Sequence, residues 1–277
     1  MLELGRTQTL QVVKETDFGV YLSEEEHTEE RVLLPKAQVP KNTKLGDKIE
    51  VFLYKDSKDR LIATTRTPKI KLHETAVLEI LEIGKIGAFV DWGLEKDVML
   101  PFAEQTRRVK KGEKYIMALY VDKSSRLCVT MKVYDYLKTN SPYQKDDTVE
   151  GIVYDVSENF GAYVAVDDCY SAMIPKYEDI KKLRPGDRIK ARVTNVKEDG
   201  KLDLSLREKA YLQMDQDADY VLQVIEEYAG VLPFNDKASP ELIKREFGLT
   251  KNAFKRAVGR LLKQGKIQIT ENSIRKI

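Results

Sequence analysis

The stretch FGAYV at residues 160–164 decides the fold of most of the chain, because related stretches occur twice more. The other two copies are FGVYL at residues 18–22 and IGAFV at residues 86–90. In each copy a glycine follows an apolar residue, and an aromatic residue stands two positions after that glycine. A pattern that recurs in this way indicates a repeated structural unit, so we expect one small domain around each copy.

Further landmarks follow each copy at nearly fixed distances. A proline comes 16, 14 and 14 residues after the glycine, and a Gly-Asp or Gly-Glu pair comes 11 residues after the proline. The prolines are Pro35, Pro101 and Pro175, and the pairs begin at Gly46, Gly112 and Gly186. Each unit closes with a short segment that ends in a basic residue, at 61–66, 127–132 and 202–207. This spacing indicates that the three units share one fold.

The pattern inside each unit is that of β-strands. Residues 162–166 (AYVAV) alternate between two faces with the period of a strand that has one buried side. Segments 114–121 and 189–196, which follow the glycine-acid pairs, are also predicted as strands. Short strands separated by turn signals favour a small closed barrel, which leaves no strand edge unpaired.

In this order the motifs resemble the S1 domain of the OB-fold superfamily. The third unit matches best, with FGAYV followed by PGD at 185–187 and KLDLSLR at 201–207. The second unit, with IGAFVDWG at 86–93, is nearly as similar, and the first carries an acidic insert, EEEHTEE, at 24–30. The resemblance implies an all-β OB-fold barrel in each unit.

The resemblance also implies where RNA binds. In S1 domains the two aromatic positions that flank the glycine stack on RNA bases, and in the third unit these are Phe160 and Tyr163. We expect Gly161 to form a β-bulge that brings both rings to the outer face and leaves Ala162 and Val164 in the core. The corresponding residues are Phe18 and Tyr21 in the first unit and Ile86 and Phe89 in the second.

The sequence departs from the usual S1 binding set, which adds a histidine, an aspartate and a basic residue. The three prolines stand at the histidine position. The first two units keep the other members as Asp56 with Arg60 and Asp122 with Arg126, whereas the third keeps Lys201 without a clear acidic match. The residues predicted as secondary RNA contacts are Phe18, Tyr21, Phe89, Asp122, Arg126 and Arg60.

Basic residues of the third unit are predicted to follow the phosphates of a bound strand. They are Lys176, Lys181, Lys182, Arg184, Arg188, Lys190, Arg192 and Lys201. Two simpler interpretations stay open, because aromatic residues beside a glycine can belong to a core and basic residues can be merely solvated. The basic cluster at 107–114 in the second unit has the same alternatives.

From residue 216 the periodicity becomes helical. The residues spaced on one helical face are Val221, Val224, Ile225 and Tyr228. Gly230 is expected to end this helix, and Ser239-Pro240 indicates the start of a second one that Gly248 ends. Thr250 is expected to cap a third helix.

The third predicted helix has one apolar face and one basic face. The apolar residues are Phe254, Ala257, Val258 and Leu261. The basic residues, which we predict to bind nucleic acid, are Lys251, Lys255, Arg256, Arg260 and Lys263. Two short strands are predicted at 266–270 and 273–277, and three helices followed by a hairpin resemble a winged-helix domain. Residues 237–276 hold 11 Lys and Arg against 3 Asp and Glu, a net charge that suits a polyanion.

The sequence therefore predicts a multidomain chain of three all-β OB-fold barrels followed by an α+β winged-helix domain. The predicted limits are 1–68, 69–142 and 143–214 for the S1-like domains and 215–277 for the winged helix. This domain order is similar to that of the conserved virulence factor B family of bacterial RNA-binding regulators. The resemblance implies control of gene expression after transcription.

Three functions stay open. The first is a regulator that binds single-stranded RNA through the third barrel and the winged helix. The second is an adaptor that contacts the ribosome or RNA polymerase. The third is a DNA-binding transcription regulator, since a basic third helix reads DNA in winged-helix relatives.

Composition argues against several other classes. No apolar stretch of the 277 residues approaches the ~20 that span a membrane, so we expect no membrane contact. The two cysteines, Cys128 and Cys169, form no disulfide framework and favour the cytoplasm. The histidines, His27 and His73, stand in no known catalytic spacing. We expect a monomer without enzymatic activity, cofactor or metal.

Overall fold

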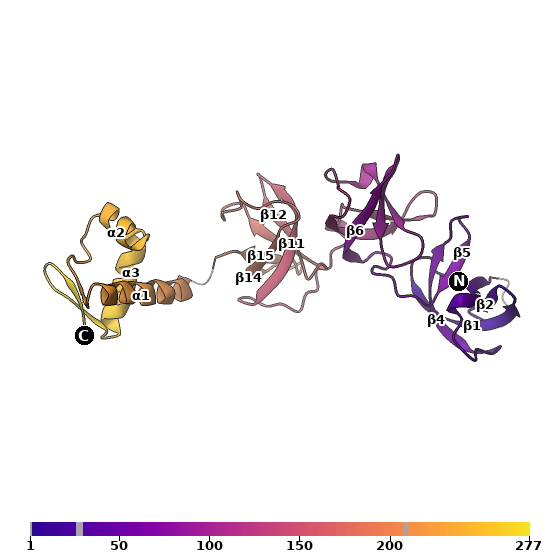
Figure 1. The fold of residues 1–277 in the computed structure, drawn as a ribbon, viewed down its shortest axis with the longest axis horizontal. Coiled ribbons are helices and arrows are strands. Elements are labelled where there is room, and N and C mark those ends of the chain that lie inside the picture. The colour runs from indigo at the N-terminus through magenta and orange to yellow at the C-terminus, as the bar shows by residue number, and fades with distance from the viewer. Residues whose placement is uncertain (1, 26–29, 208–209) are drawn as a thin grey trace. The chain divides into compact units, whose positions relative to one another are not determined.

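The computed structural model describes residues 2–25, 30–207 and 210–277. The chain divides into two compact units, residues 1–206 and 207–277, which Figure 1 draws in one colour gradient. Within the described residues, the first unit holds three closed five-stranded barrels and the second holds three α-helices and a three-stranded sheet. The predicted fold class is confirmed, while the limits of the four domains stay a prediction.

All three barrels have the same strand order. The first strand pairs with the second and the fourth, and the fifth closes the barrel between the third and the fourth. The strands of the first barrel are β1 (Thr7–Thr16), β2 (Gly19–Ser23), β3 (Val32–Pro35), β4 (Lys48–Lys55) and β5 (Leu61–Thr64). Those of the second are β6 (Thr75–Ile83), β7 (Gly87–Asp91), β8 (Val98–Pro101), β9 (Lys114–Val121) and β10 (Leu127–Thr130). Those of the third are β11 (Thr148–Ser157), β12 (Gly161–Val166), β13 (Tyr170–Pro175), β14 (Arg188–Val196) and β15 (Leu202–Ser205).

Among the described residues, three short 3₁₀ helices complete this unit. Two of them directly follow the prolines that end β3 and β8, and the third follows β10 on the way to the third barrel. They are η1 (Lys36–Gln38), η2 (Phe102–Glu104) and η3 (Tyr134–Tyr136).

The glycine of the repeated motif has a different role from the predicted one. Gly161 lies in regular register, opposite Ser157 on one side and Pro175 on the other, so the predicted bulge at this glycine is wrong. The bulge lies in the neighbouring strand, where the register shifts between Val153 and Asp155.

Close backbone approach explains why the motif needs glycine. A Cβ atom on Gly161 would lie 2.0 Å from the carbonyl oxygen of Ile174, and Gly161 has a φ of +132°. A Cβ atom on Gly19 would lie 2.0 Å from the carbonyl oxygen of Leu34, and one on Gly87 would lie 2.4 Å from that of Leu100. Since real side chains do not approach a backbone this closely, the glycine lets the second strand lie tightly against the end of the third.

Neighbouring barrels of the first unit pack against one another. Phe52 and Tyr54 of β4 lie edge-on to Trp92 of the second barrel, at ring-centre distances of 5.8 and 6.2 Å. Between the second and third barrels, Ile116 of β9 and Ile152 of β11 belong to one buried cluster. Apolar contacts therefore hold the barrels together, as they do inside each core.

The second unit is built around one apolar core. Its elements are α1 (Ala210–Glu227), β16 (Val231–Leu232), α2 (Pro240–Phe247), α3 (Lys251–Lys263), β17 (Ile267–Ile269) and β18 (Ile274–Lys276). The side chains of Ser239 and Thr250 cap α2 and α3, and Gly248 ends α2 with a φ of 65°, all as predicted. The sheet has the order β16-β18-β17, and the sequence did not predict its two-residue strand β16.

One residue of the first helical face was assigned wrongly. Tyr228 is 39% exposed and donates a hydrogen bond to Glu246, at 2.7 Å, instead of joining the core. Tyr228 directly follows the last residue of the helix, Glu227, and the φ values of 56° at Ala229 and 83° at Gly230 turn the chain out of the helical path immediately after it. Among the described residues, none of the helices combines the length and apolar character that a membrane crossing needs.

Candidate nucleic-acid interface

The two aromatic positions of the motif differ in exposure in the same way in all three barrels. The residue before the glycine projects into solvent, with exposed fractions of 79% for Phe18, 67% for Ile86 and 63% for Phe160. The residue two positions after the glycine is half-buried in each case. In the third barrel, Ala162 precedes the second of these positions and Val164 follows it, and both are fully buried as predicted.

In the third barrel the second position belongs to a cluster of three tyrosines. The ring of Tyr163 lies 6.1 Å from that of Tyr134, at 87°, and 6.0 Å from that of Tyr154, at 37°. The amine of Lys201 lies 5.4 Å from the centre of the Tyr134 ring and 3.0 Å from Asp199. The hydrogen bond from Lys201 to Asp199 raises the pKa of this lysine, which stays cationic beside the rings. A cation beside aromatic rings suits a polyanion whose bases can stack.

Sequence patterns did not reveal two members of this cluster. Tyr134 lies in η3, before the third barrel, and reaches Tyr163 only through the folded chain. Tyr154 stands at the shifted register of β11, where a bulge can redirect a side chain. Burial raises the pKa of Tyr154, and its hydroxyl has no hydrogen-bond partner among the described residues. A bulge and a long-range contact have no signature in the spacing of residues along the chain.

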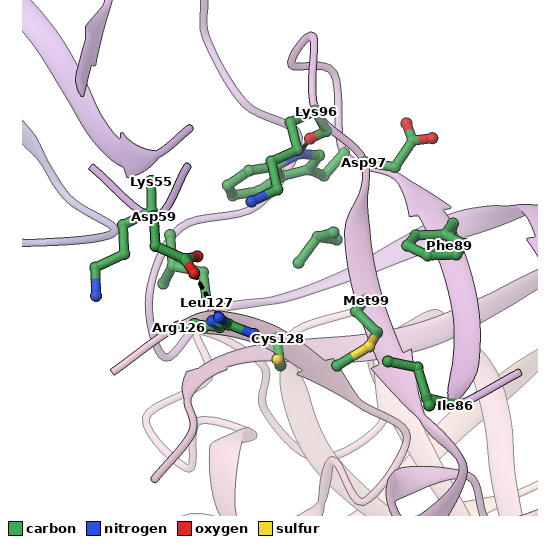
Figure 2. A pocket seen from close by; sticks show the side chains of 12 residues that line it. Lys55, Asp59, Ile86, Phe89, Lys96, Asp97, Met99, Arg126, Leu127 and Cys128 are labelled. Atoms are coloured by element: carbon green, nitrogen blue, oxygen red, sulfur yellow. Dashed lines mark hydrogen bonds and ion pairs between the residues drawn. The ribbon is translucent and has the colours of Figure 1, made fainter. Parts of the chain in front are cut away.

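Cross-strand neighbours of the second aromatic position distinguish the barrels. In the third barrel Tyr163 pairs with Met173, and Met173 pairs with Asp203. In the second barrel the corresponding row is Phe89, Met99 and Cys128, which together line one side of the pocket in Figure 2. In the first barrel the row is Tyr21, Leu33 and Ile62. The third barrel therefore has a carboxylate where the other two have apolar side chains.

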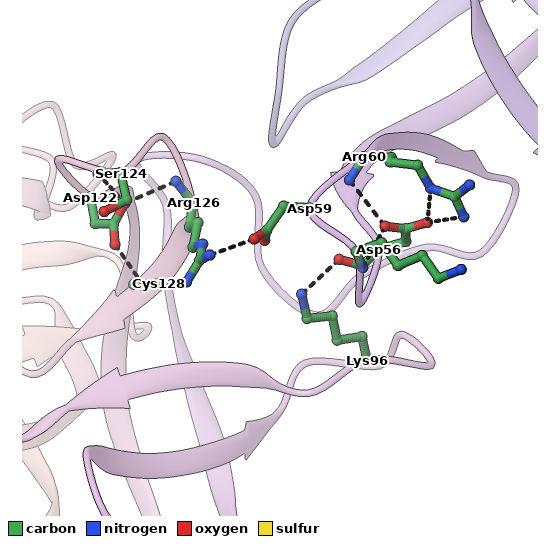
Figure 3. Close-up of polar contacts among 9 residues, drawn as sticks. Asp56, Asp59, Arg60, Lys96, Asp122, Ser124, Arg126 and Cys128 are labelled. Atoms are coloured by element: carbon green, nitrogen blue, oxygen red, sulfur yellow. Dashed lines mark hydrogen bonds and ion pairs between the residues drawn. The ribbon is translucent and has the colours of Figure 1, made fainter.

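The predicted Asp and Arg pairs lie in the hairpins before the last strand (Figure 3). Asp56 accepts hydrogen bonds from the backbone amides of Lys58 and Arg60, at 2.8 and 3.0 Å, and forms an ion pair with the Arg60 side chain at 2.7 Å. Asp122 accepts from the amides of Ser124 and Arg126, at 2.8 and 2.9 Å. Both aspartates thus stabilise a turn, and they have this structural role whether or not they contact RNA.

The third barrel stabilises the corresponding turn with different residues. Lys197 occupies the aspartate position, since its amide donates to the carbonyl of Lys201 at 2.9 Å, as Asp56 and Asp122 donate to Arg60 and Arg126. Asp199 accepts from the Lys201 amide at 3.1 Å and pairs with its amine. Asp199 is therefore the acidic partner of Lys201, for which the sequence of this unit gave no clear candidate.

The structure separates the predicted basic residues of the third barrel into groups. Lys176 adjoins Phe160, because its amide donates to the Phe160 carbonyl at 3.1 Å. Lys181, Lys182 and Arg184 follow in the exposed loop between β13 and β14.

The remaining basic residues lie on β14, which pairs with β11 and β15 and does not border β12. Lys190 is exposed there, whereas Arg188 lies 3.6 Å from Asp168 and Arg192 lies 2.9 Å from Asp146. The basic residues beside the aromatic positions are thus Lys176 and Lys201, and those of β14 belong to another side of the barrel.

In the second unit the predicted basic face of α3 lies away from the core. Phe254, Ala257, Val258 and Leu261 are buried as predicted. Lys255, Arg256 and Lys263 are exposed, and within the described residues none of the three is in an ion pair. Lys251 and Arg260 are half-buried at the edges of this face. Uncompensated positive charge is therefore offered to a polyanion by Lys255, Arg256 and Lys263.

Models of three protein domains match almost the whole chain. An S1 domain matches residues 4–66 and again 74–132, the second domain of virulence regulatory factor CvfB matches 134–208, and a CvfB-like winged-helix domain matches 219–275. The chain is thus composed of nucleic-acid-binding domain types.

Comparisons with curated relatives agree with these matches. The uncharacterized protein YitL of Bacillus subtilis is 33% identical over 273 residues, which cover 95% of this chain and 90% of YitL. Conserved virulence factor B of Staphylococcus saprophyticus is 27% identical, over 83% of this chain and 80% of that protein. A crystal structure of a Streptococcus pneumoniae multidomain protein with nucleic acid binding domains is 26% identical, covers 99% of this chain and 98% of its own, and has a TM-score of 0.49. The chain belongs to the conserved virulence factor B family.

Proposed function

We propose that this protein binds single-stranded RNA in the cytoplasm, without catalysing a reaction, and thereby regulates gene expression after transcription. The third barrel and the winged helix carry the binding. The observation on which the proposal rests is the tyrosine cluster of the third barrel, with Lys201 against it and Phe160 exposed on the same motif.

Single-stranded RNA fits this surface because its bases are free to stack. Aromatic side chains bind bases of any sequence, and neighbouring cations attract the phosphates. Phe160 offers an exposed ring and Lys176 stands directly beside it. A duplex would keep its bases stacked on one another and leave Phe160 without a partner.

The winged helix supplies a second contact through the exposed basic residues of α3. Their side chains would follow phosphates, which contributes affinity with little sequence preference. The position of this basic face on the third helix also favours a second candidate function, which is binding of duplex DNA.

The test is a filter-binding titration of the full chain with a single-stranded RNA, repeated at two salt concentrations. Phe160→Ala removes one stacked base and is expected to weaken binding by about 5- to 150-fold with an unchanged salt dependence. Lys255→Ala removes one phosphate contact and is expected to lower the slope of log K against log salt by about 0.7.

Two matched variants separate these effects from a general loss of surface aromatic or charge. Tyr220→Ala removes a 42% exposed ring from α1, and Lys237→Ala removes an exposed lysine outside α3. Both are expected to bind as the unchanged protein does. If Phe160→Ala and Lys255→Ala also bind normally, these residues are not the site.

The same titration decides among the functions. Tighter binding of a duplex than of a single strand would replace the RNA proposal by DNA binding. No binding of RNA at micromolar protein and low salt would leave the adaptor function, with the ribosome or RNA polymerase as partner.

A further inference from the structure

The tip of the second barrel carries different side chains from the tips of the other two. In each barrel the residue after the motif proline donates its backbone amide to the carbonyl oxygen of the residue before the motif glycine. Phe102 and Ile86, which form this pair in the second barrel, are 49% and 67% exposed. The second barrel therefore exposes an apolar pair where the other two place a lysine next to a phenylalanine. The three pairs are Lys36 with Phe18, Phe102 with Ile86, and Lys176 with Phe160, at 2.9, 3.4 and 3.1 Å.

Acidic residues surround Phe89 on the outer face of the same barrel. Phe89 pairs with Glu82 of β6 and with Met99 of β8. Side chains two positions apart along a strand lie on the same face, so Asp91 and Asp97 belong to this face as well. Three carboxylates around the aromatic residue thus distinguish this barrel. The corresponding positions hold Asp155, Ala165 and Ser171 in the third barrel, and Lys14, Ser23 and Arg31 in the first.

Two of these carboxylates have no ion-pair partner among the described residues. Within this part of the chain, Asp91 forms an ion pair with Lys69, whereas Glu82 and Asp97 form none. Burial and the negative charges of Asp91 and Glu82 raise the pKa of Asp97. Figure 2 shows Asp97 and Phe89 on the same side of the pocket between the first two barrels. Negative charge is therefore left beside the exposed apolar side chains.

Two cations of the second barrel in this pocket are engaged with the first barrel. The pocket has a volume of about 230 Å³, and its lining includes Lys55, Lys96 and Arg126. Arg126 forms an ion pair with Asp59, and the Lys96 amine donates to the carbonyl oxygen of Asp56, at 2.9 Å (Figure 3). Both cations therefore hold the β4–β5 hairpin of the first barrel.

The remaining cations near the face do not give it an excess of positive charge. Among the described residues, Lys55 in the pocket lining and Lys85 in the turn next to Ile86 form no ion pair. Glu82 and Asp97 balance these two charges. A chain of phosphates would also meet the carboxylates wherever one of its bases stacked on Phe89. The face is therefore poorly suited to a polyanion.

An arginine side chain fits the surroundings of Phe89. A guanidinium group stacks on an aromatic ring and donates hydrogen bonds to carboxylates, and Glu82 and Asp97 supply carboxylates beside the ring. An apolar side chain close to the arginine would remove Ile86 and Phe102 from water. A protein segment can carry both groups, whereas a nucleic acid carries no cation.

We propose that the outer face of the second barrel docks a segment of another protein in which an arginine stands near an apolar residue. The arginine stacks on Phe89 between Glu82 and Asp97, and the apolar residue covers Ile86 and Phe102. This function goes beyond the proposed RNA binding, which uses the third barrel and the winged helix. One chain can then hold an RNA and a protein at the same time.

A labelled peptide composed of arginine and leucine probes this face on the full protein. Fluorescence anisotropy measures its binding. Trp92 emission reports where it binds, because Trp92 lines the same pocket as Phe89 and is the only tryptophan of the chain. RNA retention on filters is measured in parallel. We expect saturable binding with a change in Trp92 emission, and binding weaker by about fivefold or more when glutamate replaces arginine or serine replaces leucine.

Three substitutions test the individual contacts. Ile86→Ser removes an exposed apolar contact and is expected to weaken peptide binding by about tenfold. Phe89→Leu keeps most of the volume but loses the aromatic face, and should weaken binding by about 2- to 5-fold. Asp97→Asn should weaken binding by about 2- to 5-fold and reduce its salt dependence. Ile86→Ser and Asp97→Asn should leave RNA retention unchanged.

Matched variants control for a general loss of exposed apolar surface or charge. Leu45→Ser makes a similar change at a 62% exposed residue of the first barrel. Asp17→Asn removes an exposed carboxylate from the turn before Phe18. Both should bind the peptide as the unchanged protein does.

Several results would overturn the docking face and leave the proposed function intact. They are no saturable peptide binding at about 1 mM, binding without a Trp92 response, and binding that neither Ile86→Ser nor Asp97→Asn weakens. RNA that displaces the peptide, or RNA retention that Asp97→Asn strengthens, would make RNA the occupant. Self-association that Ile86→Ser abolishes would make a second copy the occupant. Peptide binding at this face by a protein that retains no RNA supports the docking face and overturns only the proposed function.

Discussion

The second and third barrels carry the same motif and yet present it in different surroundings. In the second barrel Phe89 faces a pocket that the first barrel helps to enclose, and its row ends in the buried Cys128. In the third barrel Tyr163 lies in a cluster with Tyr134 and Tyr154, and its row ends in Asp203, which forms an ion pair with Lys197 at 3.1 Å. The second barrel shares its face with a neighbouring domain, while the face of the third is surrounded by rings and charges of that barrel and of the linker before it.

The difference teaches that the repeated landmarks specify the barrel more than its binding surface. Glycine, proline and the hairpin turn recur because each is needed for strands to meet at the same places. Residues on the outer row are free to vary, since they are not needed for closure. Neighbouring domains and linkers then decide whether the row becomes a pocket or an open platform.

The largest expected effect comes from the glycine that both barrels share. Gly161→Ala should destabilise the third barrel by roughly 3 kcal/mol or more, because its Cβ would meet the Ile174 carbonyl and its φ is +132°. Hydrogen exchange of the full chain should show lost protection in β12 and β13 and unchanged protection in α3.

Gly259→Ala provides the contrasting substitution. Gly259 lies within α3, and a Cβ there would meet nothing within 4 Å. Alanine should therefore stabilise the winged helix by about 0.5–1 kcal/mol. Normal protection of β12 in Gly161→Ala would contradict the steric explanation of the motif.

Cys128 lies buried at the end of the second barrel's row, so we predict that its thiol is alkylated slowly. Burial raises the pKa of Cys128 from 9.0 to about 11, so its thiolate at pH 8 should be about 100-fold scarcer than in the unfolded chain. Alkylation of the Cys169→Ser variant, followed by mass spectrometry in native buffer and in urea, measures this ratio.

The pH dependence has a definite sign. Since only the thiolate reacts, the native rate should rise about tenfold per pH unit up to pH near 11, as long as the fold persists. Equal alkylation rates for native and unfolded protein would mean that the row of Phe89, Met99 and Cys128 is open to solvent, like the corresponding row of the third barrel.

Particular residues show how far the sequence could predict this arrangement. The spacing of Gly161 and Pro175 predicted the barrel, and Ser239 and Thr250 predicted the helix caps, because these features depend on neighbours close along the chain. The bulge was placed at the wrong residue, since both a bulge and a close backbone contact are reasons for a glycine. Tyr134 was missed because its contact with Tyr163 exists only after the linker folds onto the barrel.

The smallest expected effect concerns the ion pair between the first two barrels. Arg126 and Asp59 have side chains that are 54% and 41% exposed, so a double-mutant cycle with Asp59→Ala and Arg126→Ala should give a coupling of only about 0.2–1 kcal/mol. Urea unfolding followed through Trp92 emission measures it. A coupling above about 2 kcal/mol would show that this pair, and not the apolar contact of Trp92, holds the first barrel in place.

Photocrosslinking tests the central claim most directly. A single-stranded RNA that carries 4-thiouridine is bound to the full chain, irradiated, and the attached peptides are identified by mass spectrometry. We predict crosslinks to the peptides that contain Phe160 with Tyr163 and to the basic face of α3, all lost with excess unlabelled RNA. Specific crosslinks confined to the first barrel, or none in the third barrel and α3, would contradict the account.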